Sequence, residues 1–280
     1  MAEITGTTGD DTIWGTDGND VLIGLAGVDW IRARGGDDFL FGGDDNDNLL
    51  GGDGNDLLSG GNGRDVALYW DTDAGVTINL GLTSAQNTGG SGIDTLLSIE
   101  NISASSYNDT LIGNGADNGL GGEGGDDLLY GMDGNDTLSG GDDNDTLTGG
   151  AGSDTLSGDY PYNSSINLGN DIFDYNAVSD SLPGFLNRDV ITDFIGRGRG
   201  TFVGDRIDLS TIDANVSVSG NQAFSWIGGA AFTAAGQLRY NTTTGILQGS
   251  TDGDTAAEFE IELVGAPALS VGGLGTDILL

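Results

Sequence analysis

The pattern of apolar and polar residues in the first part of the chain repeats every nine residues. From Gly6 to Leu68, seven nonapeptides follow one another without insertion: GTTGDDTIW, GTDGNDVLI, GLAGVDWIR, ARGGDDFLF, GGDDNDNLL, GGDGNDLLS and GGNGRDVAL. The eighth position is always apolar, the sixth is always aspartate, and the first four positions are rich in glycine. A fixed period of this kind indicates a repeat architecture in which each unit buries its apolar residue against its neighbours.

Each nonapeptide predicts one tight turn followed by one short strand. Glycine at the fourth position suits a turn that needs positive φ, and Asp45, which replaces it once, also tolerates that region. In the strand the eighth residue points inward and its neighbours point outward. Nine residues form half a coil, so two copies close one turn, and coils stack about 4.8 Å apart. We therefore expect an all-β, right-handed parallel β-roll (β-helix).

The same phase returns later in the chain, from Ala104 to Ser157, as ASSYNDTLI, GNGADNGLG, GEGGDDLLY, GMDGNDTLS, GGDDNDTLT and GGAGSDTLS. Here Asn118 replaces one sixth-position aspartate, and Tyr107 and Ala116 replace fourth-position glycines. The remaining segments lose the period but keep strand-like runs. We predict four parts: a first roll block at 1–68, a connecting β-helix segment at 69–103, a second roll block at 104–157, and a β-rich C-terminal capping domain at 158–280.

The sixth-position carboxylates would stack along the edges of such a roll, with residues 18 apart, such as Asp11 and Asp29, facing each other. Uncompensated, these charges repel one another strongly. Calcium removes the conflict because it binds six to eight oxygens from carboxylates and main-chain carbonyls. We therefore predict a set of aspartate ligands for Ca²⁺: Asp11, Asp20, Asp29, Asp38, Asp47, Asp56, Asp65, Asp109, Asp127, Asp136, Asp145, Asp154 and Asp171.

These nonapeptides resemble the GGxGxDxUx repeats of the RTX (repeats-in-toxin) calcium-binding proteins. In that family each ion lies between turns 18 residues apart and also binds carbonyls from the glycine-rich positions. The resemblance implies carbonyl ligands at Gly18, Gly27, Gly52, Gly54, Gly125, Gly134, Gly141, Gly150 and Gly152. RTX proteins of this kind are secreted, where calcium is plentiful enough for weak sites.

Residues 158–280 resemble the C-terminal domain of serralysin-type (peptidase M10) metalloproteases, through INLGNDIFDY, RDVITDF and GDRIDLSTID. Further carboxylates there could be calcium ligands or ordinary turn aspartates: Asp193, Asp205, Asp208 and the pair Asp252 and Asp254. The final Thr-Asp-Ile-Leu-Leu is similar to the uncleaved C-terminal signal of type I secretion substrates. The resemblance therefore implies the type I apparatus as a partner and an extracellular location.

Charge and composition narrow the possible partners. The chain has 44 acidic residues and 8 arginines, for a formal net charge of −36, which disfavours nucleic acid. Cysteine is absent, so no disulfide forms. The N-terminal residues show neither a basic region nor an apolar run, so we expect no cleavable signal peptide. No apolar stretch is long enough to span a membrane.

The residue inventory also argues against an enzyme. Without histidine, cysteine or lysine the chain has no HExxH zinc site, no Ser-His-Asp or Cys-His nucleophile and no Schiff base. The likeness to serralysins therefore does not extend to their catalytic domain. A glycosidase that uses two carboxylates is compatible with the residue inventory, but nothing singles out one pair of aspartates. Three roles stay open: a structural or matrix protein that could self-associate through its open ends; a polysaccharide-binding module using Trp14, Trp30 and Arg32; or the C-terminal carrier part of a secreted exoenzyme of protease, lipase or alginate-epimerase type.

Overall fold

A computed structural model describes residues 1–159, 169–196, 204–271 and 276–280, and nearly all of its regular structure is β-strand. The short 3₁₀ helix Val178–Asp180 is the one exception among these residues. Residues 166–168, which begin the INLGNDIFDY segment, lie outside the described part. The chain forms two compact units, residues 1–128 and 129–280, and each is described by itself. The division falls inside the second repeat block.

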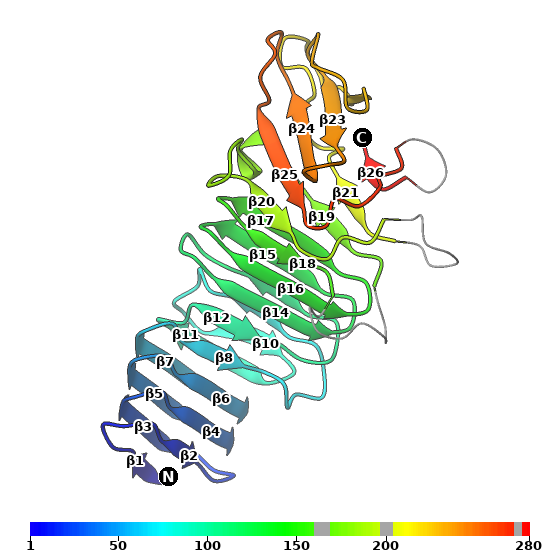
Figure 1. Ribbon diagram of the computed structural model, residues 1–280. Coiled ribbons are helices and arrows are strands. Elements are labelled where there is room, and N and C mark those ends of the chain that lie inside the picture. Colours follow the sequence, from blue (N-terminus) through cyan, green and yellow to red (C-terminus); the bar gives the residue numbers. More distant parts are fainter. Residues whose placement is uncertain (160–168, 197–203, 272–275) are drawn as a thin grey trace. The chain divides into compact units, whose positions relative to one another are not determined.

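Successive strands of the first unit alternate between parallel sheets (Figure 1). One sheet consists of β1 (Glu3–Thr5), β3 (Val21–Ala26), β5 (Phe39–Asp44), β7 (Leu57–Asn62) and β11 (Gly92–Leu97), with antiparallel β10 (Gln86–Gly89) beside β11. Another consists of β2 (Thr12–Trp14), β4 (Trp30–Gly35), β6 (Asn48–Asp53), β8 (Val66–Leu68), β12 (Asn101–Ser103) and β14 (Gly119–Gly124). A third contains β9 (Thr77–Asn79) and β13 (Thr110–Ile112).

The pairing register confirms the 18-residue coil. Leu22 lies opposite Leu40, and Leu40 lies opposite Leu58, so the eighth positions of alternate copies form one inward column. These leucines are buried, as are the eighth-position residues of the other copies in the block. Each such side chain contributes about 1.5–3 kcal/mol by leaving water. The predicted parallel β-roll is therefore present, with its core on the predicted positions.

The glycine-rich turns use positive φ at both the second and the fourth repeat positions. Gly52 and Gly54 have φ values of 91° and 147°. The fourth position was expected from the sequence, but the second was not, because several copies carry a side chain there. Leu25, for example, adopts φ 94° at the second position. Three other second-position residues do the same, namely Arg34, Glu123 and Met132. Left-handed backbone at such residues is strained and persists only where the surrounding structure holds it.

Residues 69–103 add coils to the roll, and within them GGSGIDTLL at 89–97 is a further, isolated copy of the nonapeptide, which the sequence analysis did not count. β11 places Leu96 beside Leu58, and β12 places Ile102 beside Ala67. Both added side chains are buried, so the apolar column continues through this segment. The longer path between β8 and β11 accommodates β9 and the antiparallel β10.

In the second unit, strands from the C-terminal region extend both sheets of the roll. One sheet consists of β15 (Leu128–Asp133), β17 (Thr146–Ala151), β19 (Ile172–Asp174), β21 (Arg206–Asp208) and β26 (Ile278–Leu279). The other consists of β16 (Thr137–Asp142), β18 (Thr155–Ser157), β20 (Asp189–Ile191), β25 (Phe259–Leu263), β24 (Ile246–Ser250), β23 (Gln237–Asn241) and β22 (Ser225–Trp226). Pairing turns antiparallel from β25 to β24 to β23. The β-rich C-terminal region expected from the sequence is thus confirmed.

Candidate calcium sites

The sixth-position aspartates form two ladders, one on each edge of the first roll block. In one ladder the Oδ1 of Asp29 accepts the Asp11 N–H at 2.8 Å, and the Oδ1 of Asp47 accepts the Asp29 N–H at 2.8 Å. In the other, the Oδ1 of Asp38 accepts the Asp20 N–H at 2.6 Å. The same bond recurs at Asp56 and Asp65. One oxygen of each carboxylate is therefore hydrogen-bonded to the backbone of the preceding coil.

The second oxygen of these carboxylates is buried and has no hydrogen-bond partner. This holds for Oδ2 of Asp29, Asp38, Asp47, Asp56 and Asp65 in the first unit. A buried, charged oxygen without a donor is costly, because it has lost its water and gained nothing in exchange. Each of these positions therefore needs a proton or a cation.

A main-chain carbonyl of the next coil lies near the orphaned oxygens of Asp29, Asp47 and Asp65. A side-chain carbon on Gly24 would collide with Asp29 Oδ2 and would lie 2.6 Å from the carbonyl oxygen of Gly42. One coil further on, a carbon on Gly42 would collide with Asp47 Oδ2 and would lie 2.7 Å from the Gly60 carbonyl. At Gly24 and Gly42 two acceptors thus converge, and the carboxylate oxygen has no hydrogen-bond donor. Hard oxygen ligands arranged in this way fit calcium.

The carbonyl ligands expected from the sequence belong to second- and fourth-position glycines, and they remain predictions. Eight of these nine have positive φ, namely Gly27, Gly52, Gly54, Gly125, Gly134, Gly141, Gly150 and Gly152, whereas Gly18 does not. The Gly18 carbonyl instead accepts the Thr16 hydroxyl at 3.2 Å. The resemblance also implied carbonyls from the first repeat position, and those of Gly42 and Gly60, which are not among the nine named glycines, lie near Oδ2 of Asp29 and Asp47.

Near the start of each block, the carboxylate oxygens of the sixth-position aspartates accept hydrogen bonds from the protein itself. The Oδ2 of Asp20 accepts the backbone N–H of Thr16 at 2.7 Å and its hydroxyl at 2.8 Å. Asp109 Oδ2 likewise accepts the backbone N–H of Ser105 at 2.8 Å. Asp11 likewise accepts the Thr7 hydroxyl. These predicted ligands therefore differ from the interior ones, because side chains at the second position already occupy an oxygen.

Burial changes the acidity of the interior aspartates. It raises the pKa of Asp47 to about 6, and the neighbouring Asp65 and Asp29 add to the rise. It also raises the pKa of Asp56 to about 7 and of Asp127 to about 8. By contrast, the pKa of Asp20 is lowered, chiefly by the hydrogen bond from the Ala2 N–H. Without a cation, the interior turns therefore hold protons that an exposed aspartate would release.

Both ladders continue beyond the nonapeptides through acidic residues that the sequence analysis missed. Asp94 Oδ1 accepts the Asp56 N–H at 3.0 Å, and Glu100 Oε2 accepts the Asp65 N–H at 2.9 Å. In the second unit, Asp189 Oδ1 accepts the Asp154 N–H at 2.9 Å. The tripeptides Asp-Thr-Leu at 94–96 and Asp-Val-Ile at 189–191 reproduce repeat positions six to eight. For Asp94 the full nonapeptide GGSGIDTLL at 89–97 is present, whereas Asp189 could have been found only through this short signature.

The C-terminal region repeats the chemistry of the interior turns. Asp171 and Asp189 each have a buried Oδ2 without a hydrogen-bond partner. Burial raises the pKa of Asp171 to about 8 and of Asp189 to about 9. Asp205, which was among the possible C-terminal ligands, accepts the Asp171 N–H at 3.1 Å. The predicted Asp171 thus lies in a turn of the same type, with Asp205 on the next coil.

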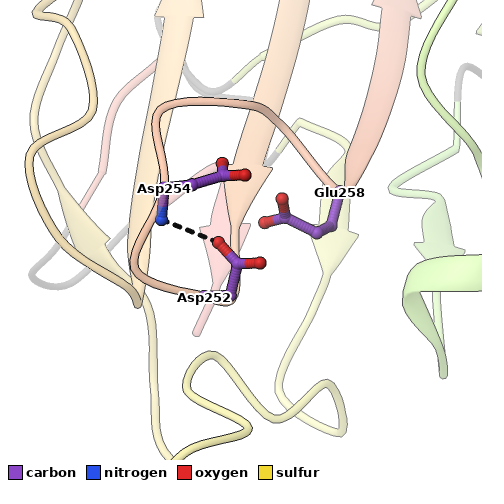
Figure 2. A group of neighbouring side chains, drawn as sticks. All are labelled: Asp252, Asp254 and Glu258. Carbon is purple, nitrogen blue, oxygen red and sulfur yellow. Dashed lines mark hydrogen bonds between the residues drawn. The ribbon is translucent and has the colours of Figure 1, made fainter.

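The other C-terminal aspartates have different surroundings. Asp193 Oδ2 accepts the Ser157 hydroxyl at 2.7 Å, whereas Asp208 Oδ1 accepts the Ser210 N–H at 2.9 Å as an ordinary turn aspartate does. Asp252 and Asp254 meet Glu258 in the loop between β24 and β25, with one oxygen of each within 4.8 Å of the others (Figure 2). Both aspartates are exposed, so this cluster lacks the burial of the ladder sites.

Comparison with known proteins identifies the repeats. Four copies of the RTX calcium-binding nonapeptide repeat match residues 5–40, 32–67, 98–129 and 121–156. Both blocks are therefore calcium-binding repeats of the RTX type. Among solved structures, the chain is similar to the solution structure of the AlgE6R3 subunit of the Azotobacter vinelandii mannuronan C5-epimerase. The two are 28% identical, the match covers 62% of this chain and 78% of that one, and the TM-score is 0.27.

No curated protein matches the chain. Among the described residues, no helix has the length and hydropathy needed to cross a membrane.

Proposed function

We propose that the chain is a secreted protein whose β-roll folds on binding extracellular Ca²⁺ and then serves as a structural, matrix or surface-associated element. The observation that carries this proposal is the row of buried, unpartnered Oδ2 atoms at Asp29, Asp38, Asp47, Asp56 and Asp65. A roll with these charges uncompensated is unstable, so the supply of cations controls folding.

The two oxygens of each interior aspartate have different roles in the turn. Oδ1 of Asp47 holds the preceding coil through the Asp29 N–H, and its Oδ2 faces the ion position. The Gly60 carbonyl of the next coil approaches the same position. These oxygens would hold a calcium ion, whose positive charge would offset the carboxylate charge at the turn. Because the arrangement recurs along the ladder at Asp29, Asp47 and Asp65, binding at one turn orders the next.

The C-terminal residues support export before folding. Asp277 and Ile278 are buried, and β26 pairs with β21. A secretion apparatus can therefore reach these residues only while the C-terminal region is unfolded. Type I secretion through this uncleaved signal is part of the proposal, and the likeness of residues 158–280 to the serralysin C-terminal domain remains a prediction. A second candidate function, polysaccharide binding, is favoured by an aromatic groove described in the next subsection.

The proposal predicts the free calcium concentration at which the chain folds. We expect β-sheet circular dichroism to appear with a midpoint of about 10⁻⁴–10⁻³ M free Ca²⁺, the range of extracellular calcium modules. Magnesium at the same concentrations should not replace calcium, since it demands smaller, octahedral sites. A chain already folded at submicromolar calcium, or one folded equally well by magnesium, would contradict a role for the extracellular ion.

A further inference from the structure

A groove of about 270 Å³ lies on the outer face of the sheet formed by β2, β4, β6 and β8. Trp14, Trp30 and Trp70 contribute to its walls, and their exposed fractions are 51%, 44% and 50%. Three half-exposed indoles side by side are unusual on a soluble protein, because large apolar patches normally mark a binding surface. The calcium ladders do not use any of these residues.

The groove is built by the chain folding back on itself after the first repeat block. Trp30 occupies an outward position on β4, and Trp70 comes from the segment that follows β8. The two indoles are nearly parallel, at 20°, with ring centroids 5.9 Å apart. Beneath them lie Leu50 and Leu68, outward ninth-position residues that are nevertheless only 2% and 4% exposed. The tryptophans therefore rest on a packed floor and are held in place.

The polar groups of the groove are few and placed beside the rings. Arg32 lies with its guanidinium carbon 5.7 Å from the Trp14 ring centroid, and one terminal nitrogen pairs with Asp71 at 2.9 Å. Its Nε is buried and has no hydrogen-bond partner. Arg34 approaches the same ring at 5.9 Å. The groove thus offers flat aromatic faces with guanidinium groups next to them, as ligand sites do.

We propose that this groove binds a neutral polysaccharide. The C–H faces of pyranose rings carry partial positive charge and stack on the electron-rich faces of indoles, while the partly exposed guanidinium of Arg32 can donate to a sugar hydroxyl at the edge of the groove. The negative charge of the chain disfavours anionic ligands in the groove. A net charge of −36 repels nucleic acid, polyuronates and a second copy of the chain, and Asp71 already neutralises Arg32. The inference rests on the proposed function, because it gives the calcium-folded roll a surface to which it attaches.

The test is calorimetric and fluorimetric titration of the full chain in saturating calcium with neutral oligosaccharides: cellohexaose, xylohexaose and laminarihexaose. A polygalacturonate oligomer serves as the anionic comparison. We expect at least one neutral chain to bind and to perturb tryptophan emission, since three of the four tryptophans line the groove. Trp30→Ala and Trp70→Ala should each weaken binding about tenfold or more. Trp226→Ala, in β22 of the second unit, is the matched control and should leave affinity unchanged.

Several outcomes would overturn the proposal: no neutral chain binds, binding survives the Trp30→Ala and Trp70→Ala double variant, or the polyuronate binds better than every neutral chain. Self-association abolished by Trp30→Ala would show that a second copy is the occupant, and would equally overturn it. Calcium-dependent circular dichroism of each variant separates the two hypotheses. If calcium folds the chain and no glycan binds, the groove proposal fails alone; if calcium does not fold it, the proposed function fails.

Discussion

Replacing Gly54 by alanine is expected to lower the free energy of unfolding of the calcium-loaded chain by about 3 kcal/mol or more. Gly54 has φ 147°, a conformation that side chains rarely adopt. An added methyl group would also overlap the carbonyl oxygen of Gly36 on the preceding coil. That neighbour is backbone in the middle of the roll and cannot move without displacing the turn that holds Asp56. Calcium-loaded thermal and urea unfolding would measure the loss.

Gly18→Ala is the matched control, because Gly18 holds the same fourth position of its repeat. Its φ is not positive, and an added methyl group would meet no heavy atom within 4 Å. The expected change in the free energy of unfolding is within about 1 kcal/mol in either direction, since only unfolded-state entropy changes. Equal destabilisation by both substitutions would show that the stacking of coils does not decide which glycines are required.

Without calcium, acidification is expected to stabilise the fold. The folded-state pKa values of Asp47, Asp56 and Asp171, at about 6, 7 and 8, lie above the unfolded value of about 3.9. The folded chain therefore binds more protons than the unfolded chain. Stability is fully present below the unfolded pKa and is lost as the pH rises through the folded values. In calcium-free buffer, melting temperature and β-sheet content should thus fall as the pH rises from about 5 to about 9.

Saturating calcium should reverse this dependence at the acidic end. Ligating carboxylates must be deprotonated, so protons compete with the ion and calcium affinity falls on acidification. Thermal unfolding followed by circular dichroism at about pH 5, 7 and 9 would show the melting temperature changing with pH in opposite directions with and without calcium. A calcium-free chain that becomes more stable as the pH rises would mean that the interior carboxylates are not buried as the structure has them.

Much of the roll could be predicted from the sequence because its period specifies register. An aspartate at the sixth position and an aliphatic residue at the eighth fix which face of each strand is buried, and Leu22, Leu40 and Leu58 stack accordingly. The aspartate ladders follow from the same period. The second-position backbone did not follow, because Leu25 and Arg34 take positive φ under restraint from neighbouring coils rather than by their own preference.

Features that depend on packing between distant segments were harder to predict. Asp189 joins its ladder without a glycine-rich turn of the repeat type before it, so the nonapeptide pattern does not mark it. Asp94 lies in an isolated copy, GGSGIDTLL at 89–97, which is out of phase with both blocks. Trp70 lies just past the point where the period breaks, and nothing in its local sequence indicates that it folds back onto Trp30. The repeat pattern predicts that Trp14, Trp30 and Arg32 lie on one outward face, but the groove exists because Trp70 of the later segment packs against Trp30.

Amide hydrogen exchange of the full chain in chelator and in calcium tests the central claim most directly, since it reports each turn of the roll separately. The Asp29 and Asp47 N–H groups donate to carboxylates 18 residues ahead, and the Val66 N–H donates to the Asp47 carbonyl. If calcium holds the acidic turns together, these amides should exchange freely in chelator and become strongly protected once calcium is added. Strong protection of the same amides in chelator would contradict the account.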